Sequence, residues 1–342
     1  MAVTIRDVAK RANVSLGTVS RYLNGYKLKE TNRIRVEQAI QELGFRENFI
    51  AKGLKNNRSM AIGVVLASLT DLFATSIVTA AERILADENY SIIVCDFESN
   101  QQKLEHKLRF LKDRSIDGLI LFPGNCTSSD ALREYLNDKI PVVIVNDDMP
   151  DINTDKVTVD NSNASFRAIE YLIHQNHRDI AIINGDQNTY TGRERYKGYL
   201  EALTTYQVQP REDYITFGHF SNSGGYEAAK KLLALPNPPT AIYTTNYYMT
   251  FGAIIAINEA KIRIPDDVSF IGFDHFDLSD VINPPLTIVE QPRERLGELA
   301  ARTVLRRIKG DYEDFPLRLS INTKMIMKDS VRRLQTAKDK RQ

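Results

Sequence analysis

The side chains best suited to chemistry are few and scattered in this chain of 342 residues. Its two cysteines, Cys95 and Cys126, each lie beside an apolar run, so they provide neither a disulfide framework nor a four-ligand zinc site, and they fit a reducing compartment. The five histidines, at positions 106, 174, 177, 219 and 275, show no metal-ligand spacing, and His174 and His177 are expected at a helix end. No phosphate-binding glycine loop, dinucleotide fingerprint, HExxH or GxSxG pattern is present. We therefore expect no catalysis, no metal and no cofactor.

Charge is segregated along the chain although its total is close to zero. The sequence carries 45 Lys and Arg against 44 Asp and Glu, a formal net charge of +1. Residues 1–58 hold twelve of the basic residues and five of the acidic ones, a charge of +7, so the remainder carries −6. Such a basic segment is typical of a surface that binds a polyanion, because each neutralised phosphate releases a counterion. A solvated basic face is the alternative that charge alone leaves open.

The elements that position these charges are predicted to be two short helices joined by a tight turn. Residues Thr4 and Asp7 have the spacing of a capping box, in which each side chain bonds the other residue's backbone N–H. The helical pattern breaks at Asn13, and Ser15 is the next N-cap candidate. Gly25 suits the left-handed position that ends the second helix. In such a pair the second helix can lie in the major groove of DNA.

A third amphipathic helix is predicted to follow, with Gly44 as its stop signal. Its apolar positions are Ile34, Val36, Ala39, Ile40 and Leu43. A small core is expected from Val8, Ala12, Val19 and Leu23 of the first two helices.

Residues 3–25 resemble the DNA-binding headpiece of the lactose and galactose repressor family. The resemblance is carried by the run from Val3 to Ser15, by Thr18-Val19-Ser20-Arg21 and by Leu23-Asn24-Gly25. It implies DNA contacts by Thr4, Ser15, Leu16, Gly17, Thr18, Ser20, Arg21 and Asn24. Leu16, Gly17 and Arg21 occupy the base-reading positions, so Arg21 is expected to supply the main hydrogen-bonded readout, to a guanine. Lys29 departs from the family, which usually has Ser there, so the third helix is expected to be capped by Thr31 or another group.

Residues 46–55 resemble the hinge of the same family. In that hinge, short helices from two subunits lie in the minor groove, and a leucine from each wedges between base pairs. Leu54 matches the leucine, Ala51 matches the small residue beside it, and Asn48 lies in the same segment. A helix this short is not stable alone, so we expect it to be disordered away from DNA. Glu47 replaces the usual Pro, and a plain linker is the alternative.

The chain from residue 60 onward is predicted to form two α/β lobes. Strand-length apolar runs at 62–66, 91–94, 118–122 and 142–145 alternate with helical patterns, and a second series lies at 179–183, 240–243 and 268–273. The fold class is therefore a small all-α helix-turn-helix headpiece plus a two-lobed α/β core with doubly wound parallel sheets. The core resembles that of the repressor family, which is itself similar to periplasmic sugar-binding proteins. A ligand cleft is expected at the carboxyl ends of the strands.

The family resemblance assigns effector contacts to six residues in this core. They are Phe73, Asn146, Arg195, Phe220, Asn246 and Asp274. These side chains suit a polyol, because Arg and Asp each bind adjacent hydroxyls and an aromatic ring covers the C–H face of a sugar. The alternatives are that the two phenylalanines belong to the core and that the aspartate is a turn residue. The sequence departs from the family at Ala74, Tyr247 and His275.

The function predicted is that of a sequence-specific transcriptional repressor. A homodimer would read an inverted repeat in double-stranded operator DNA, and a small molecule, expected to be a sugar or sugar derivative, would control it from the cleft. A purine-type corepressor or a protein coregulator is the alternative, and a sugar-binding protein without a role on DNA is a further one. The predicted segments are a headpiece (1–46), a hinge and linker (47–59), the core (60–330) and a charged tail (331–342) without a leucine heptad. No signal segment or membrane span is found, so a cytoplasmic location is expected.

Overall fold

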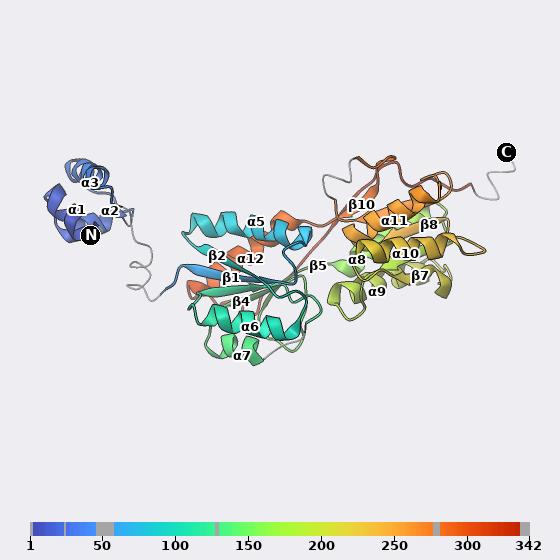
Figure 1. Cartoon of the computed structure of the whole chain (residues 1–342), viewed down its shortest axis with the longest axis horizontal. Helices are drawn as coiled ribbons and strands as arrows, with labels where there is room; N and C mark the ends of the chain where they lie inside the picture. Colours follow the sequence, from blue (N-terminus) through green and yellow to red (C-terminus); the bar gives the residue numbers. More distant parts are fainter. Residues whose placement is uncertain (1–2, 24, 46–57, 127–129, 276–280, 336–342) are drawn as a thin grey trace. The chain divides into compact units, whose positions relative to one another are not determined.

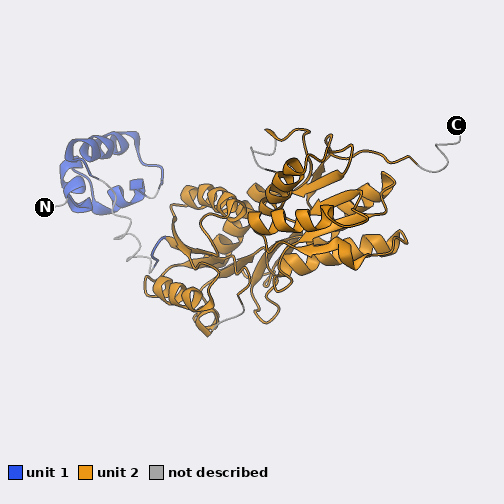
Figure 2. Cartoon of the chain, turned by 45° about the vertical axis from the view of Figure 1, so that its right-hand side comes forward, with its two compact units in different colours: residues 1–60 blue, residues 61–342 orange. Residues whose placement is uncertain are grey.

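A computed structural model describes residues 3–23, 25–45, 58–126, 130–275 and 281–335. The chain divides into two compact units, residues 1–60 and residues 61–342 (Figure 2). Unit 1 is entirely helical, whereas unit 2 holds every described strand. Within the described residues, no helix is both long and apolar enough to cross a membrane.

Unit 1 consists of three helices whose ends are set by local side-chain bonds. They are α1 (Ile5–Ala12), α2 (Leu16–Leu23) and α3 (Glu30–Leu43). The capping box at Thr4 and Asp7 is confirmed, and the Ser15 hydroxyl accepts from the N–H of Thr18 at 3.2 Å. Asn13 ends α1 with a φ of 52°, and Gly25 has a φ of 77°. The predicted helix, turn, helix arrangement is therefore confirmed. Its core contains the predicted Val8, Ala12 and Val19 together with Val36 and Ala39, and Leu23 packs against it.

The prediction of a side-chain cap for α3 is wrong. Lys29 is the N-cap residue, and no side chain bonds the first free N–H groups of this helix. An ion pair stabilises the first turn instead, with Arg33 Nη2 at 2.5 Å from a carboxylate oxygen of Glu30. Arg33 also reaches Glu37 at 2.6 Å, and because these groups are substantially exposed the pairs add little stability. Gly44 ends the helix in the left-handed conformation, as predicted.

Unit 2 contains two lobes, each built on a six-stranded sheet (Figure 1). The N-lobe (residues 61–159 and 293–321) has the strand order β11-β5-β4-β3-β1-β2, and all its strand pairs are parallel. Its strands are β1 (Ala61–Leu66), β2 (Ser91–Asp96), β3 (Gly118–Leu121), β4 (Val142–Val145), β5 (Asp155–Val159) and β11 (Arg318–Ile321). Helices α5 (Leu72–Asp87) and α12 (Arg293–Ile308) cover one face, and α6 (Gln101–Lys112) and α7 (Asp130–Asn137) cover the other.

The C-lobe (residues 161–290 and 324–335) repeats this plan with the order β12-β10-β9-β8-β6-β7. Its strands are β6 (Ile180–Asn184), β7 (Ile215–Phe217), β8 (Ala241–Thr244), β9 (Ser269–Phe273), β10 (Thr287–Glu290) and the antiparallel β12 (Lys324–Ile326). Its helices are α8 (Asn161–His174), α9 (Tyr190–Thr205), α10 (Asn222–Leu233) and α11 (Tyr247–Glu259), with a 3-10 turn η1 (Glu212–Tyr214). The doubly wound architecture predicted from the apolar runs is therefore confirmed.

The chain crosses between the lobes three times, from β5 to α8, from β10 to α12 and from β11 to β12. Neither lobe is thus a continuous stretch of sequence. Helix α12 returns to the N-lobe and packs closely on α5, because a Cβ at Gly297 would lie 2.3 Å from the backbone oxygen of Ile77. The apolar runs did not predict five of the described strands, β5, β7, β10, β11 and β12. Short edge strands and the buried charges of β5 explain most of these misses.

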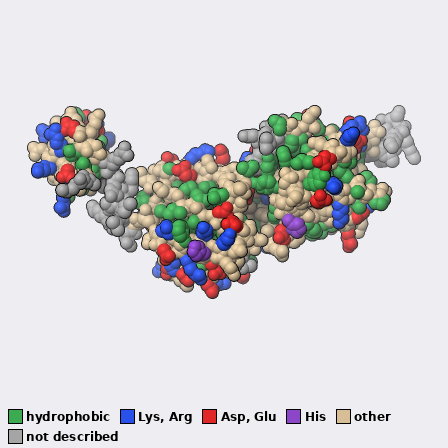
Figure 3. All heavy atoms as spheres, viewed as in Figure 1, with side chains coloured by type: hydrophobic (Ala, Val, Ile, Leu, Met, Phe, Trp, Pro, Cys, Tyr) green, Lys and Arg blue, Asp and Glu red, His purple; other side chains and the backbone are tan. Residues whose placement is uncertain are grey.

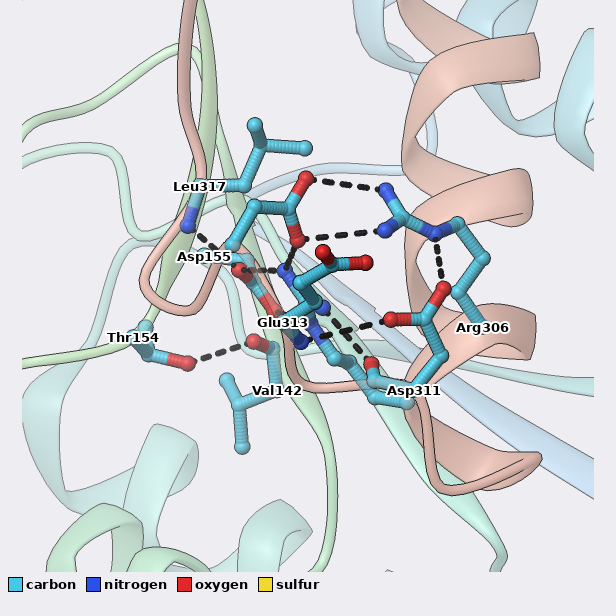
Figure 4. Close-up of polar contacts among 9 residues, drawn as sticks. Val142, Thr154, Asp155, Arg306, Asp311, Glu313 and Leu317 are labelled. Atoms are coloured by element: carbon cyan, nitrogen blue, oxygen red, sulfur yellow. Dashed lines mark hydrogen bonds and ion pairs between the residues drawn. The ribbon is translucent and has the colours of Figure 1, made fainter.

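A buried ion pair ties the start of β5 to the end of α12 (Figure 4). Arg307 donates from Nε and Nη2 to the two carboxylate oxygens of Asp155, at 2.9 Å each, and the two side chains are 0% and 1% exposed. The same carboxylate accepts from the N–H of Leu317 at 2.8 Å. This cluster therefore holds β5, α12 and the approach to β11 together.

The C-lobe also holds the chain beyond residue 330. His177, which is 0% exposed, bonds Thr240 through Nδ1 and the backbone oxygen of Arg332 through Nε2, both at 3.0 Å. The N–H of Leu334 donates to the oxygen of Gln175 at 2.9 Å. Burial lowers the pKa of His177 to about 4, so this residue is a neutral structural group near the end of α8.

Candidate functional site

A cavity of about 580 Å³ lies between the two lobes of unit 2, at the carboxyl ends of their strands. Its walls include the loop between β1 and α5 on the N-lobe and the first turns of α10 and α11 on the C-lobe. The structure brings together around it all six residues that the family resemblance selects. They are Phe73, Asn146, Arg195, Phe220, Asn246 and Asp274.

Three of these residues have a backbone conformation that L-amino acids rarely adopt. Asn146 follows β4 with a φ of 61°, Phe220 precedes α10 with a φ of 55°, and Asp274 follows β9 with a φ of 68°. Left-handed backbone at non-glycine residues costs energy and is retained where the surrounding structure or a function requires it. All three residues line the cavity between the lobes.

Arg195 forms the base of the cavity. It is 3% exposed, and its Nε donates to Oδ1 of Asn161 at 2.8 Å while Nη1 donates to the backbone oxygen of Thr245. The guanidinium lies over the ring of Phe273 at 3.8 Å from its centre. These partners hold the cation in one orientation. Its pKa is lowered by burial, with Asp274 acting in the opposite direction.

Asp274 and Gln291 form a second buried polar pair beside Arg195. Gln291 donates from Nε2 to Oδ1 of Asp274 at 2.7 Å, and these residues are 3% and 5% exposed respectively. Burial raises the pKa of Asp274, whereas Arg195 lowers it. Oε1 of Gln291 has no hydrogen-bond partner, and neither does the buried Oδ1 of Asn146. These two buried oxygens, on residues that line the cavity, therefore lack a donor within the described part of the protein.

Gln291 is a site residue that the sequence reasoning missed. It follows β10 directly, just as Asn146 follows β4 and Asp274 follows β9, but β10 was not identified as a strand. The short, mainly apolar run at residues 286–289, shortly before the Gln-Pro pair, is the signal that could have found it.

The aromatic side chains of the site line the cavity, and one of them also packs against the hydrophobic core. Phe220 lines the cavity and also packs against the buried core under α10, so the two interpretations of this residue both apply to it. Its ring lies directly over Gly185, where a Cβ would be 1.9 Å from Cζ. Phe73 is 9% exposed and lines the cavity beside Ala74, and Tyr247 lines it from the C-lobe.

A hydrogen bond joins the lobes at the cavity wall. Tyr248, on the first turn of α11, donates from its hydroxyl to the backbone oxygen of Thr70 at 2.6 Å. The same hydroxyl accepts from the N–H of Leu72 at 3.4 Å. The structure therefore holds the lobes together beside the cavity through one side chain of the C-lobe.

The predicted DNA-reading residues of unit 1 share an exposed face of α2. Leu16 is 45% exposed, Gly17 and Arg21 are exposed one helical turn apart, and Val19 is buried on the opposite side. Ser15 and Thr4 are exposed at the N-caps, and Thr18 and Ser20 are half-buried. Figure 3 shows Lys and Arg side chains at several points on the surface of this unit. Asn24, Asn48, Ala51 and Leu54 lie outside the described residues.

Family models match nearly the whole chain. Residues 4–48 match the model described as bacterial regulatory proteins, lacI family, and residues 59–329 match periplasmic binding proteins and sugar binding domain of LacI family. The probable transcriptional repressor ExuR of Bacillus subtilis is 34% identical over 340 residues, which covers 98% of this chain and 100% of the relative. The repressor PurR of Pasteurella multocida is 32% identical over 96% and 98% of the two chains, and CytR of Escherichia coli is 32% identical over 97% of each.

Solved structures of repressors are also similar. The lac repressor dimer bound to operator and the anti-inducer ONPF has a TM-score of 0.82 and 25% identity, over 97% of this chain and 100% of that one. The regulator CelR in complex with cellobiose has a TM-score of 0.73 and 28% identity, over 96% and 99% of the two chains. A LacI family regulator from Enterococcus faecium with bound ribose has a TM-score of 0.71 and 26% identity, over 80% and 100%.

Proposed function

The chain belongs to the lacI family of bacterial regulatory proteins. We propose that it is a ligand-controlled repressor in which unit 1 binds DNA and unit 2 binds the effector. It is a DNA-binding transcriptional repressor with an effector-binding core, and it acts on operator DNA as a homodimer. Unit 1 reads the operator, and the cavity between the lobes of unit 2 takes the effector. The protein has no catalytic role in this proposal, which agrees with relatives that are repressors.

DNA recognition in this proposal depends on the exposed face of α2. Arg21 reads a guanine through O6 and N7, Leu16 contacts a thymine methyl, and Gly17 contributes no side chain. Thr4, Ser15, Thr18, Ser20, Asn24 and Asn48 complete the contacts. With so little direct readout, the centre of the operator carries much of the discrimination. There, Leu54 from each subunit, beside Ala51, wedges into a deformable step, which we expect to be C-G.

The single observation that carries the effector role is the cavity between the lobes, whose lining combines Arg195, Asp274 and amide side chains with aromatic rings. The polar side chains can bind hydroxyl groups, and the rings can cover the C–H face of a sugar. The structural relatives with cellobiose and ribose hold molecules of this kind. A sugar or sugar derivative is therefore the proposed effector, bound by the six residues around the cavity. A purine-type corepressor is the second candidate.

Control follows from the lobe arrangement. An effector shifts operator affinity only by binding one arrangement of the lobes more tightly than the other. The Tyr248 hydroxyl bond to Thr70 is broken when the lobes separate, so it belongs to one of these arrangements. The hinge segment 47–59 transmits the difference to the two DNA-reading units of the dimer.

The experiment that tests this function measures operator binding by fluorescence anisotropy, with and without candidate effectors. Thermal-shift screening with sugars, sugar phosphates and purines first identifies a ligand. Asp274→Ala and Arg195→Ala should retain operator affinity in the absence of effector and lose the response to it, because these groups lie in the cavity. Loss of operator affinity by either folded variant without effector would contradict the assignment.

A further inference from the structure

The charged side chains around the cavity are mainly carboxylates. Asp71 lies on the N-lobe loop that precedes α5, Asp147 follows β4, Asp186 follows β6, and Asp274 follows β9. Among the described residues that line the cavity, Arg195 is the one Lys or Arg. Its charge is balanced by Asp274 and its donors Nε and Nη1 bond Asn161 and Thr245. Three carboxylates therefore remain without a lining cation.

The helix N-termini at this cavity already hold side-chain acceptors, which reduces their attraction for a further anion. Helices α5, α9, α10 and α11 all begin at its wall, and such N-termini attract phosphates through their free N–H groups. Each of them already has a side-chain acceptor on its first turn. The caps are Asp71 to the N–H of Phe73, Thr189 to that of Gly192, Ser221 to that of Gly224 and Asn246 to that of Met249, at 2.9–3.0 Å.

The polar atoms without partners in the cavity are acceptors. Oε1 of Gln291, a residue that is 3% exposed, and Oδ1 of Asn146 both require a donor. A ligand carboxylate or phosphate presents acceptors, so it would leave these oxygens unpaired and add repulsion from the aspartates. A hydroxyl group can donate to the carboxylates and amides that line the cavity, and it adds no charge.

We infer that the cleft selects an uncharged ligand rich in hydroxyl donors and rejects the anionic derivatives of that ligand. Uronates, sugar phosphates and nucleotides belong to the rejected class. The inference rests on the proposed effector function of the cleft. It goes further by stating which chemical class of molecule can act there.

The electrostatic potential in the cleft can be measured without knowing the identity of the ligand. The chain has no tryptophan, so Asn125→Trp, at an exposed residue of the cavity lining, provides a unique fluorescent reporter. Phe217→Trp, at a 41% exposed residue outside the lining, is the matched control. At constant ionic strength near 0.1 M, the ratio of iodide to acrylamide quenching constants should be about twofold lower at position 125 than at position 217. Caesium quenching should show the opposite order.

Neutralisation of the carboxylates completes the test. Asp147→Asn together with Asp186→Asn should remove the difference in the iodide-to-acrylamide quenching ratio between the reporters at positions 125 and 217. If Asn125→Trp does not fold, Tyr248→Trp serves as the reporter in the cavity lining. Equal iodide-to-acrylamide ratios at the cleft and control positions would overturn the inference. So would a difference that survives both neutralising substitutions.

Matched compounds then separate this inference from the proposed function. In calorimetry on the full chain, glucose should bind more tightly than glucuronate and glucose 6-phosphate, and adenosine more tightly than AMP, by about tenfold or more wherever the uncharged member binds. An anionic member that binds more tightly than its uncharged counterpart would overturn the inference. Iodide exclusion, together with no effect on operator affinity of a compound that does bind the cleft, would support the inference and count against the effector function.

Discussion

Replacing Arg307 by Met should strongly destabilise unit 2. The substitution removes two charge-assisted bonds of 2.9 Å to Asp155, and it leaves that buried carboxylate with the N–H of Leu317 still donating to it. Breaking a buried pair by removing one partner costs about 3–5 kcal/mol, because an uncompensated charge stays buried. For a unit of this size, such a loss corresponds to a fall in Tm of about 10 °C.

The neighbouring arginine provides a matched control. Arg306 reaches Asp311 at 2.9 Å and Asp314 at 3.1 Å, but its side chain is 39% exposed. Arg306→Met should therefore cost less than about 1 kcal/mol. The double variant Asp155→Leu with Arg307→Met should be less destabilised than the sum of its single variants, because it leaves no unpaired charge.

Urea unfolding followed by far-UV circular dichroism, at one protein concentration, measures these differences in the free energy of unfolding. A cost below about 1 kcal/mol for Arg307→Met, or full additivity in the double variant, would refute the buried-pair reasoning. Equal costs for the two arginine substitutions would have the same consequence.

Four further outcomes are expected. Because burial lowers the pKa of His177 to about 4, the contribution of this residue to the free energy of unfolding should be constant above about pH 7.5 and decrease by about 3 kcal/mol as the pH falls to 4; urea titrations should show a correspondingly smaller decrease in His177→Gln. Gly185→Ala should cost about 1–3 kcal/mol, since its Cβ would meet the ring of Phe220, and adding Phe220→Leu should restore part of the loss in the same assay. In binding-site selection, Arg21→Ala should relax one base pair and weaken each half-site by about 1–3 kcal/mol, whereas Leu54→Ala should flatten only the centre; an unchanged central preference would mean that residues 47–57 are a linker. Operator affinity of the full chain should fall by orders of magnitude between about 50 and 200 mM salt, and salt-insensitive binding would contradict phosphate recognition.

The helical unit was predictable in detail because its signals are local. The capping bonds of Thr4 with Asp7 and of Ser15 with Thr18 join residues three apart, and Gly25 and Gly44 adopt the left-handed backbone that their type favours. The cap of α3 was mispredicted because Lys29 takes the N-cap position, and its ammonium group offers no acceptor to the first N–H groups of the helix.

The sequence by itself determined seven of the twelve described strands and the class of fold, because most parallel strands covered on both faces are continuously apolar. The six cavity residues came from family resemblance, since no local pattern distinguishes Asn146 or Asp274 from a turn residue. Only the tertiary structure decided that α12 belongs to the N-lobe, that Arg307 pairs with Asp155 across 152 positions of sequence, and that Gln291 joins the cavity. These contacts depend on three crossings of the chain between the lobes. The residues in these contacts are far apart in the sequence and are brought together by tertiary packing. Local sequence patterns therefore do not predict which residues pair.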